Sequence, residues 1–130
     1  MLVEDAPEIR RRLLNMLAQM PDIEIAATTS GVAESIRALR ESVPDMVLLD
    51  LRLSDGSGFD VLRAIKAAGG GPAVIMLTSF PSEGCRRRFM ALGGDYIFDK
   101  SSQIDDALAL LGELARRARL RRAHDERVRQ

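Results

Sequence analysis

The stretch Met46-Val47-Leu48-Leu49-Asp50 is an apolar run that ends in a carboxylate, and a glycine-bearing loop, residues 51–58 (LRLSDGSG), follows it. The run predicts a short buried strand with Asp50 at its end. Because a carboxylate is costly to remove from water, this placement indicates a functional site rather than ordinary packing. Other polar residues stand at or just beyond the ends of further apolar runs: Glu4, Asp5, Thr78 and Lys100.

Short apolar runs predict the strands of one sheet. They are largely continuous in apolar residues, which is typical of strands that are covered on both faces of a parallel sheet. The predicted strands are residues 2–3, 23–27, 46–49, 73–77 and 96–98.

The segments between and after these runs have apolar side chains spaced about 3.6 residues apart, which predicts amphipathic helices. These segments cover residues 9–20, 32–43, 59–65, 82–92 and 104–118. The alternation of strands and helices predicts a doubly wound α/β fold with right-handed crossovers. In such folds the functional groups gather beyond the carboxyl ends of the strands.

This rule brings residues that are distant in sequence to one edge of the sheet. Glu4, Asp5 and Asp50 would repel one another there unless a cation intervened, and oxygen ligands suit Mg²⁺. A cation would make Asp50 usable as a nucleophile toward phosphorus. Lys100 would then compensate the charge of a phosphoryl group, and Thr78 would donate a hydrogen bond to it.

Length and composition limit the classes of protein to consider. With 130 residues, 46% of them apolar and 29% charged, the chain fits one globular domain. Its single cysteine, Cys85, cannot form an internal disulfide, which is compatible with a reducing compartment. No apolar stretch approaches the roughly 18 residues of a membrane span, and the first residues lack the pattern of a signal peptide. We therefore expect a cytoplasmic location.

The charge is unevenly distributed although the net charge is zero. Residues 116–129 carry seven arginines against only Asp125 and Glu126. No aromatic interleaving or DNA-reading motif accompanies them, so we expect a solvated helix end that continues into a frayed tail or linker. Direct binding of nucleic acid by this chain is not expected.

The chain resembles the CheY-like receiver domains of response regulators in two-component signalling. The segments that carry the resemblance are residues 2–5 (LVED), 48–51 (LLDL), 55–58 (DGSG), 77–79 (LTS) and 93–100 (GGDYIFDK). It covers residues 1–122 and leaves residues 123–130 as an arginine-rich C-terminal tail or linker remnant.

The resemblance implies a flavodoxin-like parallel sheet of five strands in the order 2-1-3-4-5, with five flanking helices. It also implies that Asp50 accepts a phosphoryl group from a histidine kinase or a phosphotransfer protein. Thr78 would turn toward the phosphoryl oxygens and Lys100 would pair with them. The chain would then be a signalling domain rather than an enzyme. The surface made by residues 82–92, 96–98 and the last helix would switch to bind an output protein or a second copy.

A metal site follows from the same resemblance. Asp5 would bind Mg²⁺ directly, Glu4 would bind it through water, and Asp50 and the backbone carbonyl of Arg52 would complete the protein ligands. Mn²⁺ is the alternative cation.

The chain departs from the family pattern at positions that affect switching and phosphoryl lifetime. The switch position three residues before the lysine is commonly aromatic, and here it is Ile97, so we expect backbone movement or a flanking aromatic to take its part. Ser101 replaces the proline that often follows the lysine, so a trans peptide bond is expected. Arg52 and Phe80 occupy the positions that tune phosphoryl lifetime in this family.

The first strand is short for a central strand, because only residues 1–3 precede the acidic pair. Either this domain tolerates a shortened strand, or the start is misplaced or truncated. In the second case, restoring a few preceding residues should raise thermal stability.

Other classes of protein share parts of this pattern. A haloacid-dehalogenase-like phosphatase needs a second aspartate two residues after the nucleophile, where this chain has Arg52. A flavodoxin-like cofactor binder needs a hydroxyl-rich phosphate loop after the first strand, where this chain has residues 4–7 (EDAP). A receiver-like scaffold that works without phosphorylation remains an alternative.

Overall fold

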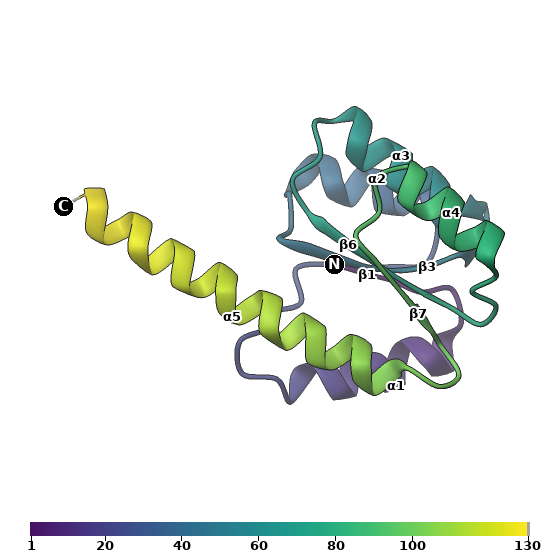
Figure 1. The fold of residues 1–130 in the computed structure, drawn as a ribbon, viewed down its shortest axis with the longest axis horizontal. Helices are drawn as coiled ribbons and strands as arrows, with labels where there is room; N and C mark the ends of the chain where they lie inside the picture. Colours follow the sequence, from purple (N-terminus) through teal and green to yellow (C-terminus); the bar gives the residue numbers. More distant parts are fainter. Residues whose placement is uncertain (130) are drawn as a thin grey trace.

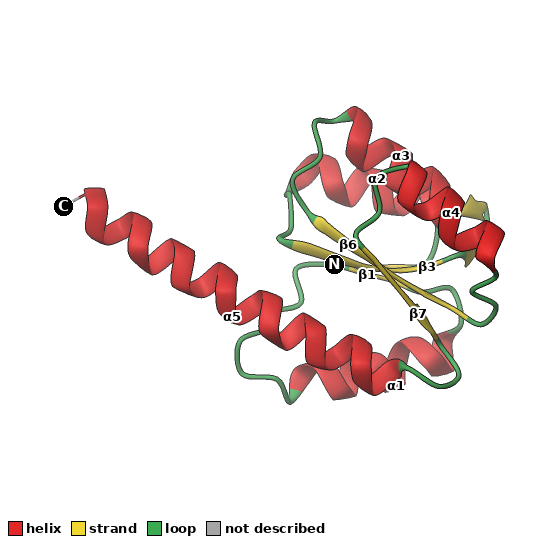
Figure 2. Cartoon of the chain, in the orientation of Figure 1, coloured by secondary structure: helices red, strands yellow, loops and turns green. Residues whose placement is uncertain are grey.

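The computed structural model describes residues 1–129 and contains a parallel sheet of five strands in the order β2-β1-β3-β6-β7 (Figure 2). This order confirms the predicted 2-1-3-4-5 topology, counted over the strands of the main sheet. The strands are β1 Leu2–Val3, β2 Thr28–Thr29, β3 Met46–Asp50, β6 Ala73–Thr78 and β7 Tyr96–Asp99.

Helices cover both faces of this sheet, as Figure 1 shows. The helices α1 and α5 lie on one face, and α2, α3 and α4 lie on the other. Their bounds are α1 Pro7–Ala18, α2 Val32–Glu41, α3 Gly58–Ala67, α4 Glu83–Ala91 and α5 Ile104–Arg129. The doubly wound α/β architecture is therefore confirmed.

The core consists of two apolar layers because successive strand residues point to opposite faces of the sheet. In β3, Val47 and Leu49 pack with α3 side chains, and Leu48 packs with Leu13 and Leu108 on the other face. Because both faces are buried, the strands are apolar at nearly every position, which explains why they appear as continuous runs in the sequence.

The helix starts have local causes in the sequence. Pro7 occupies the first turn of α1, where its missing N–H is not needed. Ser57 and Asp60 form a reciprocal capping box at the start of α3, and the Ser82 hydroxyl accepts a hydrogen bond from Cys85 N at the start of α4.

The prediction of a strand over residues 23–27 is wrong. The pairing strand β2 is Thr28–Thr29 only, in register with β1, and residues 23–27 form a loop. Parallel strands gain stability from the partner they pair with, and β1 offers only Leu2 and Val3 as partners. Leu2 N donates to the Ala27 carbonyl at 3.0 Å, and residues 23–26 lie beyond the two paired residues of β1.

The last helix is longer than the sequence indicates. It continues from Ile104 to Arg129 without a break, so the expected frayed tail is helical as far as the description reaches (Figure 1). The end of α5 projects away from the sheet. Over residues 1–129, no helix combines the length and apolarity needed to span a membrane.

Two glycines in the α4 region make a matched pair of stability tests. A Cβ at Gly94 would run into the ring of Phe89, which is fully buried, whereas a Cβ at Gly84 in α4 would meet nothing. We expect Gly94→Ala to lower the free energy of unfolding by about 1–3 kcal/mol through overpacking. Gly84→Ala should raise it by up to about 1 kcal/mol because alanine favours the helix. Urea unfolding of both variants checks this; a Gly94→Ala protein as stable as the parent would contradict the packing.

Candidate functional site

The carboxyl ends of four strands of the main sheet meet at one edge and carry the residues expected to form a site. Glu4 follows β1, Asp50 ends β3, Thr78 ends β6 and Lys100 follows β7. The backbone N–H of Lys100 donates to the carbonyl of Thr78 at 2.9 Å, which holds the last two strand ends together. The parallel sheet therefore brings together residues that lie up to 96 positions apart in the chain.

Lys100 is the centre of this cluster. Its Nζ lies 2.9 Å from Glu4 Oε1 and 3.2 Å from Asp50 Oδ1. The three side chains are largely removed from solvent, with exposed fractions of 9% for Lys100, 2% for Glu4 and 12% for Asp50. One ammonium thus neutralises much of the charge of two buried carboxylates, which could not otherwise both ionise here without a large free-energy cost.

Burial perturbs both carboxyl groups. Removal from water raises the pKa of Glu4, and the hydrogen bond from Lys100 lowers it in part. Removal from water also raises the pKa of Asp50, against the attraction of Lys100 and the backbone N–H groups of Leu51 and Arg52. Perturbed carboxyls beside a cation, at the edge of an α/β sheet, are typical of a reactive site.

A pocket of about 370 Å³ opens beside Asp50. Thr78 lies in its wall with only 4% of its surface exposed, and its hydroxyl accepts a weak hydrogen bond from Phe80 N at 3.4 Å. The Phe80 side chain stands at the pocket with 73% of its surface exposed. The full lining is Asp50, Leu51, Arg52, Thr78, Ser79, Phe80, Ser82, Cys85 and Lys100.

The loop after Asp50 is held by contacts that the sequence reasoning missed. Residues Arg52–Leu53 (β4) and Gly56–Ser57 (β5) form a small antiparallel hairpin. Within it, the Asp55 carboxylate accepts hydrogen bonds from the backbone N–H groups of Val32 and Ala33, and so caps α2 from another loop. These hydrogen bonds lower the pKa of Asp55. A DG pair after a strand was the only available signal, and it does not identify the capped helix.

Gly58 is a second residue whose part in the site was missed. A Cβ at this position would collide with the backbone carbonyl of Asp50, and Leu49 and Met76 close the space around it. Only glycine therefore allows α3 to begin directly beneath the end of β3. The sequence identified Gly58 as part of a family motif, but this contact requires the fold.

The loop that carries Lys100 is fastened on both sides. Asp99 N donates to Gln103 Oε1 at 2.8 Å, and the Asp99 carboxylate accepts from both the N–H and the hydroxyl of Ser101. The Lys100–Ser101 bond is trans, as predicted, since no cis peptide occurs among the described residues. Side-chain hydrogen bonds therefore hold the Lys100 loop, with Ser101 at the position where the family pattern often has proline.

Other predicted residues lie at the edge of this cluster. Asp5 and Arg52 are exposed, in contrast to buried Glu4. Ile97 is half-buried and packs into the core layer beneath α2–α4, whereas Phe98 belongs to the layer under α1 and α5. Tyr96 is 39% exposed. The two aromatic residues beside Ile97 thus point to the opposite face from it.

The side chains at this edge of the sheet offer oxygen ligands to a divalent cation. Within residues 1–129, no three side chains of His, Cys, Asp or Glu stand together in a ready-made metal cluster. The donor chemistry nevertheless fits a hard cation, because Glu4 and Asp50 both direct a carboxylate oxygen to one positive group, the Lys100 ammonium. Carboxylate and carbonyl oxygens are the ligands that Mg²⁺ prefers.

Comparison with known proteins identifies the family. The family model described as "Response regulator receiver domain" matches residues 1–111. The chain belongs to this family. The region that matches contains Glu4, Asp50, Thr78 and Lys100, so the buried cluster lies within the receiver fold.

The curated relatives are longer proteins. The chain is 37% identical over 126 residues to a protein-glutamate methylesterase/protein-glutamine glutaminase 2 of Anaeromyxobacter dehalogenans, covering 92% of this chain and 35% of that protein. It is 31% identical over 116 residues to a protein-glutamate methylesterase/protein-glutamine glutaminase 1 of Methanospirillum hungatei, covering 88% and 34%. The chain therefore spans about a third of the length of these relatives and corresponds to their receiver part.

Solved structures share the fold. The signal receiver domain of a putative Luxo repressor protein from Vibrio parahaemolyticus superimposes with a TM-score of 0.80 at 24% identity, over 94% of this chain and 92% of that one. A LuxR-family response regulator from Aurantimonas gives a TM-score of 0.81 at 23% identity, over 88% and 81%. At this level of identity the likeness shows the fold.

The buried carboxyls predict a dependence of stability on pH in the metal-free protein. A raised pKa means that the native state holds the proton more tightly than the unfolded state, so the contribution of these two carboxyls to stability is greatest at low pH and falls as pH rises above about 4. Glu4→Gln removes one of the two contributions and can still accept from Lys100. We expect its unfolding free energy in EDTA to fall less steeply with pH than that of the parent. Equal slopes in urea unfolding between pH 4 and 8 would contradict burial as the cause.

Proposed function

We propose that this receiver domain accepts a phosphoryl group at Asp50 from a histidine kinase or phosphotransfer protein and changes its partner-binding surface as a result. The observation that carries the proposal is the contact of the Lys100 ammonium with Asp50. Both residues line a pocket whose wall also includes Thr78. Membership of the receiver family supports it.

The reaction is a direct displacement at phosphorus. An Asp50 carboxylate oxygen attacks the phosphorus of a phosphohistidine, the P–N bond breaks, and the imidazole leaves with the electron pair and is protonated from solvent. Lys100 lies within ion-pair distance of Asp50 and would compensate the negative charge of the phosphoryl oxygens. The contact of Lys100 with Glu4 would hold the ammonium in position beside Asp50.

The metal expected for this transfer is Mg²⁺, with Mn²⁺ as the alternative. Asp5, Glu4, Asp50 and the backbone carbonyl of Arg52 would hold it, with Glu4 acting through water. When bound, the cation would offset the charge of the phosphoryl oxygens. Lys100 Nζ donates a hydrogen bond to Glu4 Oε1 in this structure, so Lys100 and the metal would compete for the Glu4 carboxylate.

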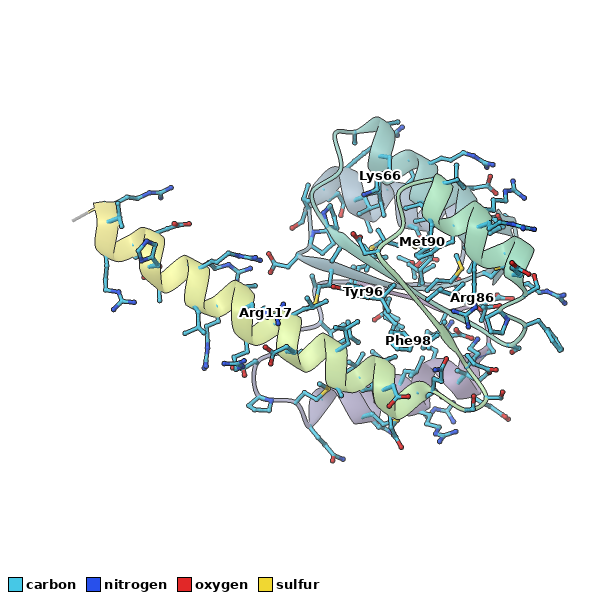
Figure 3. The ribbon with its side chains drawn as sticks, in the orientation of Figure 1. Lys66, Arg86, Met90, Tyr96, Phe98 and Arg117 are labelled. Carbon is cyan, nitrogen blue, oxygen red and sulfur yellow. The ribbon has the colours of Figure 1, made fainter. Side chains whose placement is uncertain are left out.

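The signal would pass from Thr78 to the surface formed by α4, β7 and α5. Thr78 would rotate its hydroxyl toward the phosphoryl group, giving up the weak contact with Phe80 N. Met90 and Tyr96 are exposed on this surface, and Figure 3 shows them with Arg117 along α4, β7 and α5. Because Ile97 is packed in the core layer rather than exposed, we infer that backbone movement of β7 carries the change. An output protein or a second copy would bind there.

The domain would promote only its own phosphorylation and dephosphorylation, and would not be an enzyme acting on other substrates. A scaffold that works without phosphorylation is the second candidate. The paired Lys100, Asp50 and buried Thr78 favour phosphorylation, because a scaffold has no need to bury two carboxylates at the cost that burial imposes.

Phosphorylation is tested by mass measurement. Treatment with a small-molecule phosphodonor and Mg²⁺ should add the mass of one phosphoryl group to the parent protein and none to Asp50→Asn. Asp55→Asn is the matched control, because its amide oxygen can still cap α2 and the residue lies in the same loop. It should be phosphorylated like the parent.

Omission of Mg²⁺ or addition of EDTA should abolish the mass gain. A mass gain that persists in Asp50→Asn would place the phosphoryl group elsewhere and overturn the assignment. No gain and no metal-dependent response to a phosphate analogue in the parent would favour the scaffold.

Phe80 is expected to prolong the phosphorylated state. Its ring stands at the pocket mouth and would hinder the water that attacks phosphorus and releases inorganic phosphate from Asp50. Phe80→Glu should increase the hydrolysis rate several-fold, since the smaller acidic side chain can orient water. The decay of phosphorylated protein, followed by mass or Phos-tag electrophoresis, measures this. A slower decay than in the parent would refute the proposal.

A further inference from the structure

Three consecutive arginines, Arg10, Arg11 and Arg12, stand in the first half of α1, a few residues after the acidic pair. Arg11 and Arg12 are exposed, whereas Arg10 is half-buried. The Nη1 atom of Arg10 donates a hydrogen bond to the backbone carbonyl of Glu4 at 3.0 Å. One member of the run therefore reaches back to the turn from which Glu4 and Asp5 project.

The carbonyl of Glu4 lies beyond the ladder between β1 and β2. Glu4 N donates to the Thr29 carbonyl at 3.0 Å, so this peptide group faces β2. The next donor of a parallel ladder would be Gly31, but β2 ends at Thr29 and Gly31 is the residue that precedes α2. Arg10 supplies a side-chain donor in place of this strand residue.

The start of α1 has no side-chain cap. Ala6 occupies the N-cap position, where Ser, Thr, Asp or Asn usually closes the first turn with a side-chain hydrogen bond. Arg10 holds this turn twice. Its backbone N donates to the Ala6 carbonyl at 2.9 Å, and its guanidinium donates to the Glu4 carbonyl. The path of the chain between β1 and α1 therefore depends on Arg10.

We infer that Arg10 is a positioning residue for the acidic pair: it fixes the turn so that Glu4 points inward to Lys100 while Asp5 stays exposed. Within residues 1–129 the Arg10 guanidinium makes no ion pair with either carboxylate, because it donates to a backbone carbonyl instead. It therefore shapes the turn and leaves both carboxylates to other partners.

These partners differ in what they rest on. The contact of Glu4 Oε1 with Lys100 Nζ at 2.9 Å is present in the structure. The divalent cation that would take Asp5 rests on the proposed function, since carboxylate oxygens suit Mg²⁺ and Mn²⁺. The role of Arg10 is therefore measured in two ways, one with metal and one without.

The metal-free measurement uses the two lysines of the chain, Lys66 and Lys100. Lys66 lies in α3 and serves as the internal reference, whereas the Lys100 ammonium is buried against carboxylates. A short pulse of reductive methylation in EDTA, followed by peptide mass spectrometry, gives the labelling rate of each. In Arg10→Met we expect Lys100 to be labelled several-fold faster than in the parent and Lys66 to be unchanged, because Glu4 no longer holds the ammonium in place.

Two variants serve as controls. Arg11→Met removes the neighbouring exposed arginine and should be labelled at Lys100 like the parent. Arg10→Lys keeps a charged donor on a long side chain, so its Lys100 labelling should lie closer to the parent than that of Arg10→Met. The affinity for Mn²⁺, read from the free metal by electron paramagnetic resonance, should fall several-fold in Arg10→Met and keep the parent value in Arg11→Met.

Equal labelling of Lys100 in Arg10→Met and Arg11→Met would overturn the inference. A parallel rise at Lys66 would also overturn it, because it would indicate a general loosening of the fold. Arg10→Lys labelling as fast as Arg10→Met would show that a donor at this position does not matter, with the same consequence. A parent protein that binds no Mn²⁺ would contradict the metal site of the proposed function, and Lys100 labelling would still decide the role of Arg10.

Discussion

The contact of the Lys100 ammonium with the carboxylates of Glu4 and Asp50 is the interaction on which the carboxyl edge of this protein depends. The three groups leave the sheet from different strand ends, so the contact exists only when β1, β3 and β7 stand in one parallel order. Because burial penalises both carboxylates, losing the ammonium would leave an uncompensated charge in the sheet edge. The same arrangement keeps a carboxylate oxygen of Asp50 beside a positive charge and a pocket.

The loops around this cluster are fixed by small, specific contacts more than by the apolar core. Gly58 allows α3 to start against the carbonyl of Asp50, Asp55 ties the loop after Asp50 to α2, and Gln103 holds the Lys100 loop. Hydrogen bonds of this kind restrain a loop while leaving the surface above it open. The two apolar layers beneath, with Val47 in one and Leu48 in the other, fix the positions of the strand ends from which these loops start.

The two edges of the sheet differ in how their strands end. At the carboxyl edge, strands β3, β6 and β7 end together and their polar residues converge. At the amino edge, β1 spans two residues beside the five-residue β3, and the Met1 ammonium donates to the carbonyl of Met46 at 2.8 Å. Beside β1, residues 23–27 form a loop whose last carbonyl, that of Ala27, accepts a hydrogen bond from Leu2 N at 3.0 Å.

Local pattern determined much of this protein. Apolar runs and helical spacing predicted the sheet, its helices and the residues at its edge, because burial on both faces leaves a strong periodic signal. Pairing was decided only by the tertiary structure: the 23–27 run has the composition of a strand, but the strand that pairs with β1 is Thr28–Thr29. The sequence could name Asp50, Glu4 and Lys100 but not their contact, nor the capping of α2 by Asp55. Such contacts join distant segments, and their distances depend on register and loop path, which composition does not encode.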